Sequence, residues 1–422
     1  MSDSKIRVAI SGGGLAGSLL FHALAKHAHL DVHIFESAKS FREEGAAIGL
    51  ARNALDALDL IDLSATQCLK RAGAVPLRGV RFMLAQGEHQ GSMIDEEDGE
   101  SNGKRVTTIV HRAAFLRELL ADVPSNRMHN SKKLERIEKK DSQAGPITLY
   151  FTDGSTHECD ILVGADGIHS SVRKMIDPDA VPRNTGWWAV MVLKPFAEAE
   201  ASLSKGPRDI DSREYMWVGD GAFALHNVLN NGQLVQLIIA SKDEAAESSD
   251  RWHREVSADV LRKISENWPE HLKGTVEKLI CDQPAQPALY LWDHLPAKSY
   301  VSGPICVIGD AAHATTPWQG SGGGMSIEDC LILSALLGRS NGLAEALVAL
   351  SVYDQVRRPR TQSIVESSRV TGTILAGQGE ETQLDLEKLK EKLLPRWSFI
   401  IDFDNEAHLH EALKILGEKL QR

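Results

Sequence analysis

Apolar and polar residues along the first 40 positions follow the order strand, helix, strand. Residues 6–10 form a short apolar run that ends in the glycine-rich turn Ser11–Gly14, and residues 32–35 form a second apolar run. Between them, residues 15–24 place leucines at helical spacing. The pattern predicts a βαβ unit with a glycine-rich turn after its first strand.

The same kind of pattern continues along the rest of the chain. It predicts strands at residues 147–151, 155–163, 187–193, 234–239 and 305–308, and helices at 53–63, 111–120, 257–268, 272–279, 325–337 and 406–420. The acidic segment 95–104 is expected to form an exposed loop or hairpin tip. The mostly helical region after residue 344 is expected to break near Pro359. Its last helix, at 406–420, is expected to cap the fold or to form a dimer contact.

Composition narrows the possible functions. The 422 residues are 42% hydrophobic and 25% charged, as in soluble globular proteins, and a net charge of −11 without a basic stripe argues against nucleic-acid binding. The five cysteines show no spacing typical of a disulfide framework or a zinc site, so no metal is expected. Neither a signal peptide nor a membrane span is recognisable. A cytoplasmic protein is therefore predicted.

The first glycine motif carries the first functional indication. Gly12, Gly14 and Gly17 form a G-x-G-x-x-G pattern, which allows a tight turn and brings a pyrophosphate close to the backbone and to a helix N-terminus. Glu36 ends the second strand, where an acidic residue binds an adenosine ribose hydroxyl. The motif predicts a dinucleotide site, but alone it leaves both NAD and FAD open.

Two later motifs distinguish between these cofactors. Asp166-Gly167 follows a predicted strand, and Gly309-Asp310 is followed by a glycine-rich loop that ends at Met325. With this set of motifs, the chain resembles the group A flavoprotein aromatic hydroxylases, close to the salicylate-hydroxylase-like FAD-dependent monooxygenases. The resemblance covers roughly residues 5–370 and implies FAD as the cofactor, with NADH or NADPH as a transient reductant.

The resemblance also implies a fold and its division into domains. It is an α/β fold with a Rossmann-like FAD-binding domain of the p-hydroxybenzoate hydroxylase type, an inserted β-sheet substrate domain and C-terminal helices. The FAD-binding domain is expected at residues 1–75, 105–180 and 300–350, the substrate domain at 76–104 and 181–299, and the helical region at 351–422.

Matching positions receive roles from the same resemblance. The first motif and Glu36 hold the ADP half of FAD, Arg112 reaches the cofactor, and the loop that ends at Met325 lies beside the isoalloxazine ring. The N-terminus of the following helix then stabilises negative charge on reduced flavin. The expected FAD contacts are Gly12, Gly14, Leu15, Ala16, Gly17, Glu36, Arg112, Asp166, Gly309, Asp310, Gly320, Gly322, Gly323, Gly324 and Met325.

The substrate end of the chain departs from the common family pattern. Many relatives carry Tyr-Arg-Gly where this chain has Val190-Met191-Val192, Tyr-Pro where it has His226-Asn227, and histidine where it has Trp318. His226 is a candidate to accept the phenol proton, and it is equally well explained as a satisfied core or surface histidine. The expected substrate contacts are Trp188, Met191, Trp217, His226, Pro317 and Trp318.

The family chemistry implies how the protein acts. NADH or NADPH reduces FAD, dioxygen forms a flavin C4a-hydroperoxide, and an aromatic small molecule is hydroxylated. Loss of the arginine disfavours a simple benzoate and favours a bulkier or less acidic phenolic or polyketide-like compound, or an N-heteroaromatic. The alternatives are a flavin epoxidase or dearomatising hydroxylase of secondary metabolism, a non-catalytic FAD-fold binding protein, and an NAD-linked dehydrogenase that uses only the first motif.

Overall fold

A parallel sheet near the N-terminus forms the base of the nucleotide-binding part. The computed structural model describes residues 5–41, 47–98, 103–139, 145–203, 213–229 and 233–421. The strand order is β19-β20-β12-β1-β2-β8, with all neighbours parallel except β19 and β20. The strands are β1 Ile6–Ser11, β2 Leu30–Phe35, β8 Met128–His129, β12 Ile161–Gly164, β19 Val301–Ser302 and β20 Ile305–Val307.

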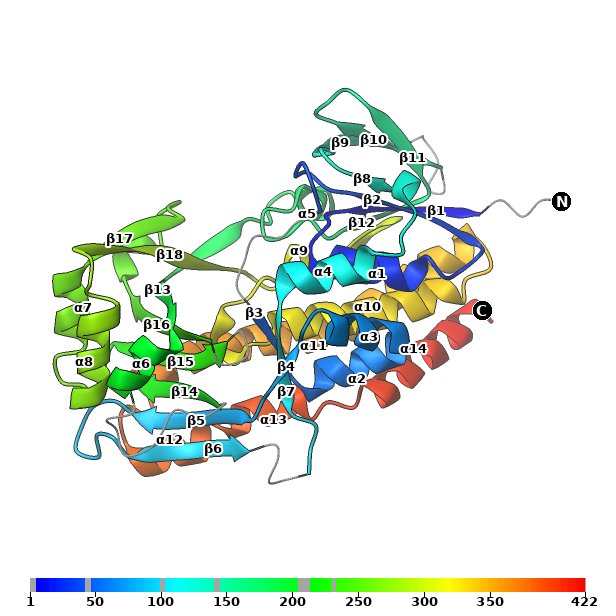
Figure 1. Ribbon diagram of the computed structural model, residues 1–422. Helices are drawn as coiled ribbons and strands as arrows, with labels where there is room; N and C mark the ends of the chain where they lie inside the picture. Colours follow the sequence, from blue (N-terminus) through cyan, green and yellow to red (C-terminus); the bar gives the residue numbers. More distant parts are fainter. Residues whose placement is uncertain are drawn as a thin grey trace.

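The central strands β1, β12 and β20 are short, mostly apolar and buried on both faces, as is typical of a parallel sheet covered by helices. Helix α1 (Leu15–Leu24) connects β1 to β2 and packs against α4 (Arg112–Leu120) and the long α10 (Gly322–Gly338). Figure 1 shows this group of elements on the side of the molecule where the N-terminus lies. The predicted βαβ unit is therefore confirmed, with the glycine turn at the carboxyl end of β1.

Two three-stranded sheets flank this core. One has the order β11-β10-β9 and the other the order β3-β7-β4. The predicted hairpin at Asp153-Gly154 is β10 and β11, and the chain then returns to the parallel sheet as β12. The strands are β3 Ala47–Leu50, β4 Val75–Leu77, β7 Thr107–His111, β9 Leu134–Lys139, β10 Ile147–Phe151 and β11 Thr156–Cys159.

An eight-stranded mixed sheet forms the other half of the molecule, in the order β17-β18-β13-β16-β15-β14-β5-β6. Its strands are β5 Gly79–Leu84, β6 Met93–Asp98, β13 Pro182–Pro195, β14 Arg213–Val218, β15 Ala222–Leu229, β16 Leu234–Lys242, β17 His253–Ser257 and β18 Ala285–His294. Residues 95–98 of the loop or hairpin tip expected at 95–104 thus belong to strand β6, and residues 99–102 lie outside the described part.

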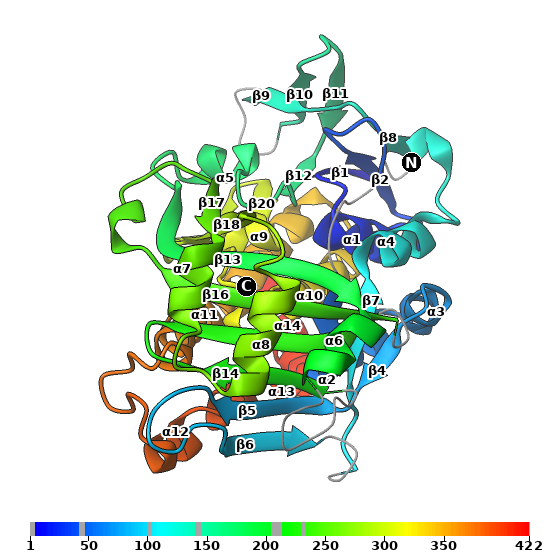
Figure 2. The same ribbon diagram turned by 60° about the vertical axis from the view of Figure 1, so that its left-hand side comes forward.

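Both faces of this sheet are covered, which decides where its side chains point. One face packs against α6 (Phe196–Leu203), α7 (Ala258–Ile264) and α8 (Glu270–Leu279), which lie in front of the strands in Figure 2. The other face packs against the C-terminal helices. Alternate residues of one strand therefore belong to two different cores.

The C-terminal helices join the two halves. Helix α11 (Leu343–Leu375) runs through Pro359 without ending, so the expected break is wrong. Pro359 and Gln355 lie on the exposed side of the helix, where water can bind the carbonyl that loses its partner. The remaining C-terminal helices are α12 Leu386–Lys392, α13 Pro395–Ile401 and α14 Asn405–Leu420.

Helix α14 packs against α10, α11 and α2 (Arg52–Ile61), with Ala412 and Leu416 buried, and so caps the fold. The shorter helices α3 (Leu63–Arg71), α5 (Ser171–Ile176) and α9 (Asp310–His313) complete the α/β architecture. Among the described residues, no helix combines the length and the apolar character that crossing a bilayer requires. The fold class predicted from the sequence is confirmed, whereas the domain boundaries stay a prediction.

Candidate functional site

A groove at the carboxyl end of β1 is built by the first glycine motif. Gly12 has φ +111°, and a Cβ atom there would lie 2.2 Å from the carbonyl oxygen of Ala165. At Gly17 a Cβ atom would lie 2.0 Å from the carbonyl oxygen of Gly12. Only glycine fits such contacts, so both residues press the turn against the end of β12 and the start of α1.

This groove presents hydrogen-bond donors to a ligand. Helix α1 begins at Leu15 after Gly14, without a side-chain cap and without an acidic residue in its first turn. Its first N–H groups therefore lack intrahelical partners and suit a phosphate. The Glu36 carboxylate lies at the same groove, where it accepts from the backbone N–H of Gly13 at 2.6 Å and of Ala38 at 2.7 Å.

The groove has a volume of about 360 Å³. Asp166 also lines it, and its carboxylate accepts from the Ser170 hydroxyl and from the Ser171 backbone N–H at the start of α5. Asp166 thus holds the start of α5 as well as a wall of the groove. The sequence did not single out Phe35, Lys132, Lys133, His169 or Ser171 for this groove.

A second cavity, of about 380 Å³, continues from this groove. The two share Gly14, Ala165 and Gly167. Of the expected FAD contacts, the second cavity is lined by Gly14, Leu15, Ala16, Arg112, Asp310, Gly320, Gly322 and Gly323.

A second helix N-terminus lies at this cavity. Helix α10 begins at Gly322 after Ser321, with no side-chain cap and no acidic residue in its first turn. Gly320 has φ +60°, which turns the loop into the helix. The N–H groups and partial positive charge at this end suit an anionic edge of a bound ring.

Three expected cofactor contacts do not line the cavities described here. Gly17 packs against Gly12, Gly309 packs against Ala16 and Ser326, and Met325 is buried in the core beneath the large sheet. Their small size or apolar character serves close packing of the turns that carry the cavity wall.

A buried charge network holds the Gly309-Asp310 turn. Asp329 accepts from the backbone N–H of Gly309 at 3.0 Å, from His313 Nε2 at 2.6 Å and from Arg357 Nε at 2.9 Å. Burial opposes the charge of Asp329, but His313 and Arg357 outweigh it and hold the pKa of this carboxyl below its ordinary value. The second carboxylate of the network, Glu328, lies 2.9 Å from Arg357 Nη1.

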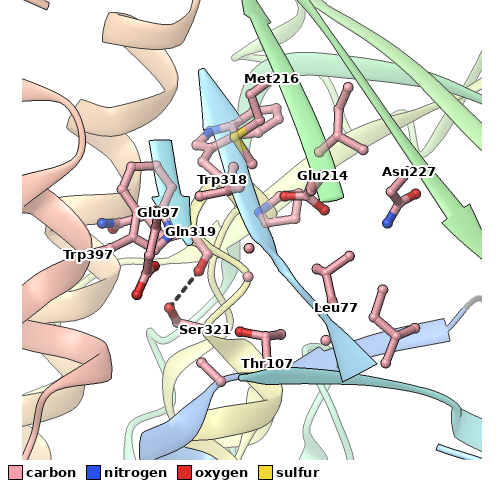
Figure 3. A pocket seen from close by; sticks show the side chains of 18 of the residues that line it. Leu77, Glu97, Thr107, Glu214, Met216, Asn227, Trp318, Gln319, Ser321 and Trp397 are labelled. Atoms are coloured by element: carbon pink, nitrogen blue, oxygen red, sulfur yellow. Dashed lines mark hydrogen bonds between the residues drawn. The ribbon is translucent and has the colours of Figure 1, made fainter. Parts of the chain in front are cut away.

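The third cavity, of about 270 Å³, lies between the large sheet and the glycine loop (Figure 3). It shares Ala47, Gly49, Pro317, Gly320 and Ser321 with the second cavity. Most of its wall is apolar, and part of that wall consists of Leu77, Ile109, Met216, Phe223, Leu225, Ile238, Trp318, Trp397, Ile400 and Ile401. A planar apolar molecule placed here would lie next to whatever occupies the second cavity.

Two of the expected substrate contacts, Pro317 and Trp318, line this cavity, as does Gly324. Met191 is 44% exposed and does not line it. Trp188 and Trp217 belong to the core on the face of the sheet that α6, α7 and α8 cover, so they point away from the cavity.

His226 also lies on the wrong face, which corrects the expectation that it contacts the substrate. Its ring stacks on Tyr215 at 4.7 Å, and Asn227, the next residue, lines the cavity instead. Burial and then the charge of His271 lower the pKa of His226 to about 3. A neutral imidazole on the far side of the sheet cannot accept a proton from a ligand in this cavity.

The cavity contains polar residues that the sequence did not reveal: Glu97, Glu214, Asn227 and Gln236. Helix α13 closes it with Trp397, Ile400 and Ile401, which come from far along the chain. Only the strand register identifies these residues, because β14 and β15 are buried on both faces and show no alternation of apolar and polar side chains.

The first two cavities fit FAD as the sequence predicts it. Together they contain the uncapped N-termini of α1 and α10, and the Glu36 carboxylate lies at the end farthest from α10. Glycine backbone lines the space between these groups. The residues would hold the adenosine end at Glu36, the phosphates at α1 and the flavin at the start of α10.

Comparison with known proteins also indicates that this chain binds FAD. The family model described as FAD binding domain matches residues 5–368. The 6-methylsalicylate 1-monooxygenase of Aspergillus terreus is 32% identical over 430 residues, which cover 100% of this chain and 94% of that protein. Salicylate hydroxylase of Pseudomonas putida is 29% identical over 437 residues, which cover 99% of this chain and 97% of that protein.

A solved structure extends the similarity to three dimensions. A substrate complex of salicylate hydroxylase superimposes with a TM-score of 0.84 at 26% identity. The match covers 97% of this chain and 98% of that chain, so both halves of the fold and the C-terminal helices are shared.

Proposed function

Since the chain belongs to the FAD binding domain family and is an FAD-dependent aromatic monooxygenase, we propose that it hydroxylates a phenolic small molecule bound in the cavity beneath the large sheet. One observation carries this proposal: Pro317, Gly320 and Ser321 line both that cavity and the one suited to the flavin. A ring held against the sheet would therefore lie beside a flavin held in the second cavity.

FAD, reduced by NADH or NADPH, supplies the reactive oxygen from dioxygen when it is bound. The residues of this chain orient the ring and keep water away from it. Phe223, Leu225 and Ile238 form an apolar sheet surface, and Trp397 with Ile400 covers the opposite side. Such a dry, shaped cavity favours transfer of oxygen to the ring over its loss as hydrogen peroxide.

The test is substrate-stimulated oxidation of NADH and NADPH by the FAD-loaded protein under ¹⁸O₂, with a panel of phenols, naphthols and indoles. We expect a hydroxylated product that contains one ¹⁸O atom. Hydrogen peroxide is measured alongside, because a poorly seated ring speeds reduction without being oxidised. An oxidised product without ¹⁸O, or peroxide alone with every aromatic compound, would contradict the proposal.

The same experiment distinguishes hydroxylation from the second candidate activity. An epoxide or a dearomatised ring containing ¹⁸O would assign the protein to the epoxidase or dearomatising class, which uses the same two cavities. A cytoplasmic location and a homodimer stay predictions.

A further inference from the structure

A row of side chains crosses the large sheet along the wall of the substrate cavity. Glu97 of β6 pairs with Val80 of β5, and Val80 pairs with Glu214 of β14. Asn227 of β15 pairs with Gln236 of β16. All five residues line the cavity, so the row follows one line across five strands.

Glu214 and Asn227 are the neighbours at the centre of this row. Tyr215 pairs with His226 on the same two antiparallel strands, and Glu214 and Asn227 are the next residues beyond that pair. Cross-strand neighbours have Cβ atoms about 5 Å apart, so both side chains reach the same part of a ligand. Figure 3 shows them on neighbouring strands at one side of the cavity. We call Glu214, Asn227 and Gln236 the polar row.

Polar atoms of this row lack partners in the described part of the protein. Among the described residues, which include its neighbours on β5, β14 and β15, the Glu214 carboxylate has no hydrogen bond or ion pair. The Asn227 Oδ1 atom is buried without a hydrogen bond, and so is Oε1 of Gln319 on the glycine loop. Buried acceptors without donors are costly unless a ligand supplies the donors.

The charges around the cavity favour a ligand that carries no negative charge. Glu97 and Glu214 are the ionisable side chains among its described lining residues. Glu97 is neutralised by Arg52 at 2.7 Å, and Arg52 also contacts Asp402. Glu214 has no such counter-charge among the described residues. A ligand carboxylate beside Glu214 would therefore meet a like charge inside a largely apolar cavity, which disfavours its binding.

The titration of Glu214 fits a role in proton transfer. Burial raises the pKa of Glu214 to about 7. A carboxyl with a pKa near neutrality can accept a proton from a bound hydroxyl and return it to solvent. In that step one proton moves from the ligand oxygen to the carboxylate, which leaves a phenolate and a neutral Glu214.

We propose that the polar row binds the donor-bearing edge of a neutral aromatic substrate, with Glu214 accepting the hydrogen bond of its hydroxyl or ring N–H, and that it selects against aromatic carboxylates. The inference rests on the proposed function for the identity of the site, and it adds the chemical class of the ligand. It distinguishes this chain from the salicylate-type relatives, whose names imply substrates that carry a carboxylate.

The test compares 2-naphthol with 2-naphthoate, which share a ring system and differ in the group offered to the row. Equilibrium binding to the FAD-loaded protein is followed by the change in flavin absorbance at pH 6 and pH 8. We expect 2-naphthol to bind at least tenfold more tightly at pH 8. The preference should shrink at pH 6, where Glu214 is mostly protonated and the like charge is removed.

Two variants isolate the carboxylate. Glu214→Gln keeps size and polarity but removes the charge, so the naphthol preference should fall about tenfold and lose its pH dependence. Glu255→Gln removes an exposed carboxylate of the same sheet, so the naphthol preference and its pH dependence should stay unchanged. FAD content and thermal unfolding of each variant confirm that it is folded.

Three results would overturn the inference: equal binding of both ligands by the unaltered protein, an unchanged preference in Glu214→Gln, or no binding of either ligand. These outcomes are independent of turnover. A protein that shows the charge preference but inserts no ¹⁸O would refute the monooxygenase proposal and leave the ligand class standing. A protein that inserts ¹⁸O into an aromatic carboxylate as readily as into a phenol without a carboxylate would refute the ligand class and support the monooxygenase proposal.

Discussion

Arg357 is a fully buried cation whose partners belong to the helix that follows the glycine loop. Its guanidinium lies 2.9 Å from Glu328 and 2.9 Å from Asp329. Asp329 in turn binds the backbone N–H of Gly309 and the ring of His313. One side chain on α11 thereby fixes the position of the Gly309-Asp310 turn at the second cavity, although Arg357 itself lines none of the three cavities.

Replacing Arg357 with methionine should therefore destabilise the fold and weaken FAD binding together. The change removes the cation that Glu328 and Asp329 share, and loss of one partner of a buried ion pair costs about 3–5 kcal/mol. Arg360 at 3.2 Å from Glu328 and His313 at 2.6 Å from Asp329 remain, so the lower end of this range is expected. The free energy of unfolding is measured in urea, and the FAD content is measured by absorbance after gel filtration.

The neighbouring residue provides the control. Arg358→Met removes a partly exposed pair with Asp354 at 3.0 Å, so its effect should stay below about 1 kcal/mol with FAD retained. Equal losses in the two variants would show that the buried network does not hold the turn.

His226 and Asn227 are neighbours on β15, but their side chains point to opposite faces of the sheet. On β15, the apolar residues occupy both faces because helices cover both sides of the sheet. The local pattern therefore contains no signal for which face meets the ligand. The glycine motifs could be recognised because each acts within a single turn, whereas the cavity wall depends on pairings between strands that are distant in sequence.

At the scale of elements, Pro359 illustrates a local rule overridden by its surroundings. A proline inside a helix removes one hydrogen bond and normally ends or kinks it. Here Val356 and Arg357 are buried on one side of α11, and packing against α10 continues on that side. The disturbed carbonyl lies on the exposed side, so the helix runs on across the molecule.

Pro359→Ala should consequently stabilise the protein. Alanine restores the missing hydrogen bond and removes the clash of the ring with the preceding turn, effects that together are worth about 3 kcal/mol in helix interiors, and gives back about 1 kcal/mol through the more flexible unfolded chain. A net gain of about 2 kcal/mol in the free energy of unfolding is expected from urea titration.

Pro395→Ala serves as the comparison, because Pro395 occupies the first turn of α13, where its fixed φ suits the helix. That variant should be neutral or slightly destabilised. A stability loss in Pro359→Ala would mean that the proline ring itself contributes packing on the helix surface.

At the scale of the whole molecule, three adjoining cavities lie between β1 and the large sheet. The groove at β1 and the second cavity share Gly14, and the second and third cavities share Gly320 and Ser321. Helix α13 closes the far end, and Gln319 of the glycine loop is tied to it by a 2.8 Å bond to the Arg396 carbonyl. Helix α13, labelled in Figure 1, is thus part of the cavity wall, although no motif marks it.

Trp397 tests whether this closure matters. Its side chain lines the substrate cavity and packs at 5.1 Å against Phe82 of the sheet. Trp397→Ala opens the cavity to water, so we expect the fraction of NAD(P)H converted to hydrogen peroxide to rise severalfold while FAD content stays the same. Phe399→Ala, on the exposed side of the same helix, should convert the same fraction of NAD(P)H to hydrogen peroxide as the unaltered protein. If both variants yield product and peroxide in the original ratio, α13 supports the fold without sealing the site, and the exclusion of water must come from the sheet and the glycine loop.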